Sequence, residues 1–97
     1  MTITAFLDIH VAAASLGEAP DVLRATLADT RNFDGCLGVD VLIDTDDSTH
    51  FVLVEKWASL EHDAAYREWR AGPGKSPLGD ILAGVPVLTK FDTALDI

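Results

Sequence analysis

The alternation of two hydrophobic periodicities along the chain is the feature that most constrains its fold. Alternating apolar residues or runs of β-branched residues mark four segments as strands: residues 2–12, 36–44, 50–57 and 85–91. Apolar residues at helical spacing mark two segments as amphipathic helices: residues 18–32 and 59–71. The sequence therefore predicts the order strand, helix, strand, strand, helix, strand.

Local signals at the helix ends support these boundaries. Pro20 suits the first turn of a helix, where its missing N–H is not needed, and Ser59 has the side chain of an N-cap. The glycines of Asp34-Gly35 and Gly72-Pro73-Gly74 end the two helices. We expect the first helix to bury one stripe of residues: Val22, Leu23, Thr26, Leu27 and Thr30. We expect the second helix to bury Leu60, Ala64, Ala65 and Trp69.

The element order repeats a β-α-β unit, which is the split β-α-β plan of ferredoxin-like folds. The turn at residues 45–48 is so short that the strands on either side of it form an antiparallel hairpin. A chain of 97 residues is one domain's worth. We therefore expect residues 1–97 to form a single α+β domain, in which a four-stranded antiparallel sheet carries both helices on one face.

The other face of that sheet is also apolar. Phe6, Leu42, Val52 and Val54 have the parity opposite to that of the strand residues that would meet the helices. An uncovered face with so many large apolar groups exceeds what monomers usually expose. We therefore expect a homodimer in which two copies cover this face with twofold symmetry.

Charge and composition exclude several classes of function. Sixteen acidic residues against seven basic residues give a net charge of −9, which repels phosphate backbones and anionic lipids. We therefore expect no nucleic-acid and no membrane binding. No apolar run approaches the roughly 18–20 residues that span a bilayer, and the N-terminus lacks a basic secretory signal, so we expect a cytoplasmic protein. One cysteine, Cys36, excludes an internal disulfide, and the three histidines lack metal-ligand spacing.

Two short motifs give the chain a family resemblance. Asp34-Gly35-Cys36 opens the second predicted strand, and Glu55-Lys56-Trp57 ends the third, followed at once by Ser59 and an acidic helix start. This pattern resembles the antibiotic biosynthesis monooxygenase family, whose members commonly show Pro/Asp-Gly-Cys and Glu-x-Trp at these places. In element order the resemblance covers nearly the whole chain.

The resemblance implies a dimeric α+β barrel with a pocket between the sheet and the helices of each subunit. Some family members oxidise polycyclic phenols to quinones with molecular oxygen and no metal or flavin. We therefore expect a cofactor-independent monooxygenase that oxidises a hydroxylated aromatic or quinol and needs no cofactor. The alternative is a non-catalytic dimeric module that binds a small apolar ligand. The chain departs from the aromatic oxidisers in one respect: residues 51–54 lack the asparagine that these enzymes can carry on the third strand.

Three residues are candidates for catalysis. The resemblance makes Trp57 the aromatic wall of the pocket, although a strand-end tryptophan also fits a core position. Tyr66 stands near a position where many family members have histidine; its hydroxyl lies either in the pocket or at the surface. A phenol can hydrogen-bond a substrate oxygen but is a poor base at neutral pH. His10 is either a proton acceptor or a residue of the surface or dimer interface.

Four more residues are candidates for substrate binding. Asn32 either orients a substrate oxygen or caps the first helix. Glu55 shares a strand face with Trp57, which places it inward. A buried carboxylate is either paired or protonated, and Arg24, Arg31 and Arg67 are the candidate partners. Phe33 and Trp69 would line the pocket. If Phe33, Leu37 and Trp69 instead fill it, the binding module is favoured. Residues 72–84 are a lid over the pocket or a surface connection.

Overall fold

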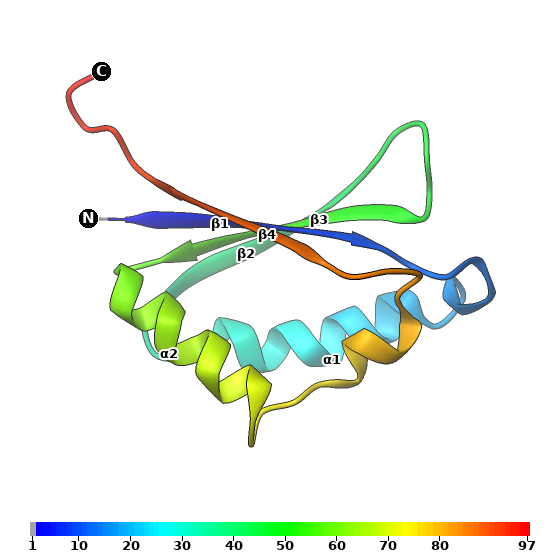
Figure 1. Ribbon diagram of the computed structural model, residues 1–97. Helices are drawn as coiled ribbons and strands as arrows, with labels where there is room; N and C mark the ends of the chain where they lie inside the picture. The colour runs from blue at the N-terminus through cyan, green and yellow to red at the C-terminus, as the bar shows by residue number, and fades with distance from the viewer. Residues whose placement is uncertain (1) are drawn as a thin grey trace.

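The computed structural model describes residues 2–97 and confirms the predicted order of elements. The strands are β1 (Ile3–His10), β2 (Cys36–Ile43), β3 (His50–Trp57) and β4 (Val87–Asp92), and the helices are α1 (Ala19–Arg31) and α2 (Leu60–Ala71). Two short 3-10 helices, η1 (Ala13–Ser15) and η2 (Pro77–Ile81), interrupt the connections. The strands form one antiparallel sheet in the order β2-β3-β1-β4, and both helices lie on one face of it (Figure 1).

The register between the two central strands decides which residues meet the helices. Ala5 of β1 lies opposite Glu55 of β3, and Leu7 lies opposite Leu53. These residues face the helices, and Ala5, Glu55 and Leu53 are at most 1% exposed. The alternate pair His10 and His50 faces away from the helices. The predicted parities of β1 and β3 are therefore confirmed.

The core between sheet and helices has two parts. The larger part packs Ile9, Phe51 and Leu53 of the sheet against Leu23 and Leu27 of α1. The smaller part packs Ile3, Ala5 and Trp57 of the sheet against Tyr66 of α2. Because the expected stripe of α1 is buried as predicted except for the half-buried Val22, this helix follows its sequence pattern.

The inward face of α2 differs from the prediction. Leu60 is 50% exposed, and Ala64 and Ala65 are exposed as well, whereas Asp63 and Tyr66 are buried. Ser59 caps the helix, its Oγ accepting a hydrogen bond from the backbone N–H of His62 at 3.1 Å. From this start, positions 63, 66, 67 and 70 share the inward face at helical spacing. The prediction of an apolar stripe was wrong because this face is polar.

Strand β2 contains an irregularity that the alternation did not predict. The register with β3 shifts between Cys36 and Gly38, so Leu37 is an extra residue that lies outside the regular pairing and is 61% exposed. Gly38 has a φ of 152° at this point. Beyond it Val39 returns to the helix-facing side and is buried. Leu37 is therefore unable to fill the space between sheet and helices.

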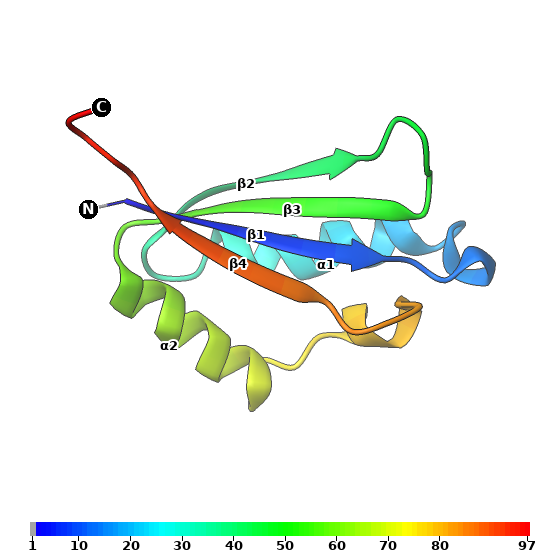
Figure 2. The same ribbon diagram turned by 45° about the horizontal axis from the view of Figure 1, so that its top comes forward.

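The segment from residue 72 to residue 86 closes one side of that space (Figure 2). Its helix η2 buries Leu78 and Ile81 in the larger core. Its backbone is tied to the end of β1: the N–H of Ala12 donates to the carbonyl of Ile81 at 2.8 Å, and the N–H of Ala83 donates to that of His10 at 2.7 Å. Pro86 precedes β4 directly, as expected for a residue without a backbone donor.

Within residues 2–97, neither helix has the length and apolar character that crossing a bilayer would require.

Candidate functional site

A cavity of about 320 Å³ lies between the sheet and the two helices. Leucines from every side form its apolar walls: Leu7 and Leu53 from the sheet, Leu27 from α1, and Leu78 and Leu82 from the segment after α2. Its polar wall consists of Thr26, Glu55, Tyr66, Arg67, Arg70, Lys75 and Ser76. An apolar cavity with a few convergent polar groups is the usual form of a small-molecule site.

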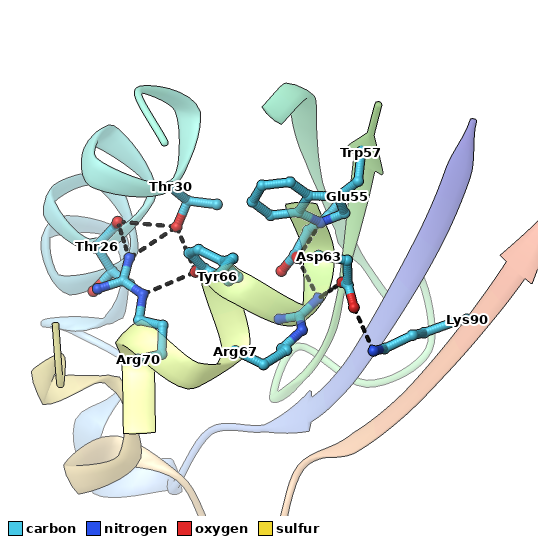
Figure 3. Close-up of polar contacts among 9 residues, drawn as sticks. All are labelled: Thr26, Thr30, Glu55, Trp57, Asp63, Tyr66, Arg67, Arg70 and Lys90. Carbon is cyan, nitrogen blue, oxygen red and sulfur yellow. Dashed lines mark hydrogen bonds and ion pairs between the residues drawn. The ribbon is translucent and has the colours of Figure 1, made fainter. Parts of the chain in front are cut away.

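Glu55 is the central polar residue of this wall. Its carboxylate is 1% exposed, and its Oε1 accepts hydrogen bonds from Arg67 Nη2 at 2.6 Å and Trp57 Nε1 at 3.1 Å (Figure 3). Of the three arginines considered from the sequence, Arg67 is thus the partner. The ion pair explains how an acid can be buried on a central strand.

A second buried carboxylate completes the charge balance. Asp63 is 0% exposed, and its Oδ1 accepts a hydrogen bond from the same Arg67 Nη2 at 2.9 Å. Its Oδ2 forms an ion pair with Lys90 of β4 (Figure 3). Glu55 and Asp63 are therefore matched by two cations, so the buried group carries no net charge.

The hydroxyl of Tyr66 belongs to a separate network on the α1 side of the cavity. It lies 2.7 Å from Thr30 Oγ1 and accepts a hydrogen bond from Arg70 Nε at 2.8 Å. Arg70 Nη2 also donates to the carbonyl of Thr26 and to Thr30 Oγ1, each at 2.8 Å, and its Nη1 donates to the carbonyl of Gly74 at 2.9 Å. Tyr66 is 4% exposed, so its hydroxyl lies inside the protein rather than at the surface.

Trp57 lies behind this wall and does not line the cavity. It is 0% exposed, and its ring centroid is 4.8 Å from that of Tyr66 and 6.2 Å from that of Phe33. The centroids of Phe33 and Trp69 are 5.3 Å apart, which extends the aromatic cluster to the half-buried end of α2. Trp57 is therefore a core residue that also holds Glu55 in place through its indole N–H.

The structure does not bring His10 or Asn32 into the site. His10 lies on the opposite face of the sheet, where its ring stacks on that of His50 at a centroid distance of 4.5 Å. Its position follows from its parity with Phe6 and Asp8. Asn32 is exposed, and its Nδ2 donates to the carbonyl of Ala28 at 3.1 Å, which is the helix-capping alternative.

Two buried polar atoms beside the cavity have no hydrogen-bond partner in the described part of the chain. They are Thr26 Oγ1 and Arg67 Nε, which come from opposite walls. Burying an unpaired polar group costs free energy.

Cys36, on the sheet near the aromatic cluster, has the properties of an apolar residue. Burial raises the pKa of its thiol, which disfavours the reactive thiolate. Cys36 packs against both parts of the core. Cys36 is therefore a partly buried apolar residue of the core rather than a nucleophile.

The sequence analysis missed Asp63, Arg70 and Thr30 as members of the site. The signal that would have found them is the helical spacing of Asp63, Tyr66, Arg67 and Arg70, which places four polar residues on one face. Such a face is usually solvated. Here the polar face of α2 turns inward, because the buried Glu55 on the neighbouring strand needs Arg67 as its cationic partner.

Comparison with known proteins agrees with this architecture. The family model described as antibiotic biosynthesis monooxygenase matches residues 2–74, a range that includes Glu55, Trp57, Tyr66, Arg67 and Arg70. The chain belongs to this family. Lys90, η2 and β4 lie beyond the matched range of the antibiotic biosynthesis monooxygenase model.

Solved structures show the same fold at low sequence identity. A variant of SnoaB, a cofactor-independent oxygenase from Streptomyces nogalater, has 16% identity and a TM-score of 0.79, with 99% of this chain and 98% of that chain covered. Rv0793 from Mycobacterium tuberculosis has 20% identity and a TM-score of 0.75, with 97% and 96% covered. A conserved protein from Methanosarcina mazei Go1 has 13% identity and a TM-score of 0.81, with 97% and 94% covered. Among curated proteins, none matches the sequence.

Proposed function

We propose that this member of the antibiotic biosynthesis monooxygenase family is a cofactor-independent monooxygenase that oxidises a hydroxylated aromatic or quinol with molecular oxygen. The observation that carries the proposal is the buried Glu55 carboxylate on the wall of an apolar cavity, next to Arg67 and Tyr66. Leucine walls suit a flat apolar substrate, and the polar wall suits its oxygen atoms.

The proposed chemistry begins with removal of a proton from the substrate hydroxyl. Both hydrogen bonds that Glu55 accepts within the described residues fall on Oε1, which leaves Oε2 to act as the general base. The Arg67 guanidinium stabilises the negative charge that develops on the substrate oxygen. The substrate anion then gives an electron to molecular oxygen, and the two combine. One oxygen atom enters the substrate, which becomes a quinone, and the other leaves as water with the two hydrogens that the substrate loses: the hydroxyl proton taken by Glu55 and one ring hydrogen.

Tyr66 and Arg70 have a positioning role in this proposal. The hydroxyl of Tyr66 is hydrogen-bonded to Thr30 Oγ1 and accepts a hydrogen bond from Arg70 Nε. These bonds hold the phenol ring between the aromatic cluster and the cavity. A fixed ring defines one edge of the space in which the substrate lies. Correct placement of reacting atoms contributes to rate without any covalent role for the residue.

One observation favours the alternative, a non-catalytic module for a small apolar ligand. The space directly against Trp57 is occupied by Phe33 and Tyr66, so the aromatic cluster is packed rather than open. The ligand would then lie against the leucine walls. The two functions differ in the role of Glu55: in the enzyme it removes a proton from the substrate, and in the binding module it only forms part of the cavity wall.

We expect purified, metal-stripped protein to consume oxygen faster than the autoxidation blank with at least one of a panel of dihydroxynaphthalenes and anthrones. Glu55→Gln should lower this rate by about 10²–10⁴, the usual contribution of a general base. The matched control is Glu61→Gln on the exposed start of α2, which should leave the rate unchanged. The measurement is oxygen-electrode uptake, with circular dichroism to verify folding of each variant.

Two outcomes would redirect the assignment. Equal uptake by wild-type protein and Glu55→Gln would remove Glu55 from the chemistry. Absence of uptake together with binding of the same compounds, detected by tryptophan fluorescence, would identify the binding module instead.

We also propose that the protein is a homodimer that buries the outer face of the sheet. A groove on this face is lined by four apolar and two polar residues: Phe6, Val52, Val87 and Phe91 with Asp8 and Thr89. The two helices lie on the other face of the sheet and leave this one uncovered (Figure 2). Phe91 is 52% exposed and Val87 60% exposed, although both are large apolar residues. A second copy with the same groove would cover them across a twofold axis.

Phe91→Lys should convert this dimer to a monomer, because it places a charge in the centre of the apolar groove. The side chain is half exposed in the single chain, so the fold itself should persist. The measurement is sedimentation velocity. The control is Leu60→Lys, a substitution of an equally exposed residue on α2, which should remain dimeric. A dimeric Phe91→Lys protein would place the interface elsewhere.

A further inference from the structure

Two histidines that are 40 residues apart in the sequence meet on the outer face of the sheet. His10 and His50 lie directly opposite each other on β1 and β3, and Asp8 precedes His10 by two positions on the same face. One potential ligand atom from each of the three residues lies within 4.8 Å of the other two. Asp8 Oδ2 is 2.9 Å from His50 Nε2, and Asp8 Oδ1 is 3.9 Å from His10 Nδ1.

A further carboxylate orients His50 from behind. Asp44 Oδ2, at the end of β2, lies 2.8 Å from His50 Nδ1. A metal-binding histidine commonly donates its second ring N–H to a carboxylate, which fixes the tautomer and turns the other nitrogen toward the metal. Asp44 does this here, because the Nδ1–H bond to Asp44 directs Nε2 toward Asp8. An acidic cluster alone would lack this arrangement.

We propose that Asp8, His10 and His50 bind a divalent transition-metal ion of the zinc type, with Asp44 as the residue that positions His50. Neutral imidazole nitrogens and a carboxylate oxygen are ligands that zinc accepts. Zinc–ligand bonds of about 2.0–2.2 Å in a tetrahedron place ligand atoms about 3.3 Å apart. The 2.9 Å between Asp8 Oδ2 and His50 Nε2 is shorter than that value, and the 3.9 Å to His10 Nδ1 is measured from the other oxygen, Oδ1, so the side chains must move to bring one oxygen and both nitrogens to this spacing.

Binding requires one local rearrangement. The rings of His10 and His50 are stacked with an interplanar angle of 5°, whereas a metal ion lies in the plane of each imidazole that binds it. His10 therefore turns out of the stack. Its side chain is 55% exposed, so no packed neighbour prevents this.

The electrostatic surroundings favour a cation. Carboxylate oxygens lie within 2.9 Å of both ring nitrogens of His50, Asp8 Oδ2 at Nε2 and Asp44 Oδ2 at Nδ1 at 2.8 Å, so negative charge surrounds the proposed position of the ion. The site lies on the face opposite the Glu55 cavity, so it is separate from the proposed oxidation. It shares the outer face of the sheet with the proposed dimer groove, which Asp8 also lines.

Zinc binding to the metal-stripped protein, measured by isothermal titration calorimetry, tests the proposal. We expect one zinc ion per chain. Asp44→Asn should weaken binding by about 10–100-fold, the usual effect of losing a residue that orients a ligand. His10→Gln and His50→Gln, which remove direct ligands, should weaken it by more than that. The matched control is His62→Gln, the third histidine, which lies at the start of α2 and should bind zinc as the wild type does.

A second readout distinguishes loss of the site from loss of the fold or the dimer. Cobalt bound at a site of this geometry gives visible absorption, and sedimentation velocity reports whether each variant keeps the assembly of the wild type. Loss of zinc and of the cobalt absorption in His10→Gln, with assembly and circular dichroism unchanged, supports the site. Wild-type zinc affinity in either His10→Gln or His50→Gln overturns it, as does the absence of zinc binding by the wild-type protein.

Discussion

Arg67→Met should lower the free energy of unfolding by about 3–5 kcal/mol, the usual cost of leaving buried charges without their partner. A single nitrogen of Arg67, Nη2, donates to both Glu55 and Asp63, and these carboxylates are 1% and 0% exposed. Methionine has a similar length but no charge. Lys90 would still face Asp63, but Glu55 would lose its cation.

The test is urea denaturation followed by circular dichroism at one fixed protein concentration, because the proposed dimerisation would make stability depend on concentration. The matched control is Arg24→Met. Arg24 pairs with Asp21 on α1 at 2.8 Å, but both side chains are largely exposed, and such pairs contribute only about 0–1 kcal/mol. If Arg67→Met and Arg24→Met lowered the free energy of unfolding by similar amounts, the buried ion pair would have no special role in stability.

Trp57→Ala should be about as damaging, with an expected loss of about 3–5 kcal/mol. The indole is fully buried, packs against Tyr66 and Phe33, and donates a hydrogen bond to Glu55. Alanine would leave a large cavity at the end of β3 and remove one of the donors to a buried carboxylate. The cavity and the missing hydrogen bond both lower the free energy of unfolding.

Urea denaturation of Trp57→Ala is best compared with that of Trp69→Ala. Trp69 belongs to the same aromatic cluster but is half buried, so its removal should cost less. Circular dichroism serves for both variants, since each loses a fluorophore. If Trp69→Ala proved the more damaging, the aromatic cluster would depend on its outer member and Trp57 would not be its centre.

The periodicity of the strands and of α1 was sufficient to predict the sheet and the face that each residue of β1 and β3 presents. Glu55 is the clearest case, because its parity with Trp57 placed it inward before any contact was known. The same parity placed His10 with Phe6 and Asp8, on the face away from the helices. This parity alone predicts that His10 lies outside the pocket.

The polar face of α2 was not predictable by the same means. Helical spacing identifies a stripe but not the side that faces inward, and Leu60, Ala64 and Ala65 formed the more apolar stripe. In the structure Asp63 is buried and Arg67 is half-buried, because Glu55 on β3 and Lys90 on β4 compensate their charges. Pairings between residues far apart in sequence, such as Lys90 with Asp63, leave no trace in local patterns. The extra residue Leu37 in β2 is a further case, since alternation continues through it in the sequence.

The hydrogen bonds of Arg70 have a consequence for the width of the cavity between the sheet and the helices. One guanidinium holds the carbonyl of Thr26 on α1, the hydroxyl of Tyr66 on α2 and the carbonyl of Gly74 beyond it. The two helices and the chain that follows them are thereby held at one spacing, and they are unable to separate to admit a wider molecule without breaking several hydrogen bonds. The width of the space is therefore determined by the volumes of Leu7, Leu27, Leu53 and Leu82. Exchanging one of these leucines for a larger or smaller side chain should therefore change the volume of the cavity while the backbone stays in place.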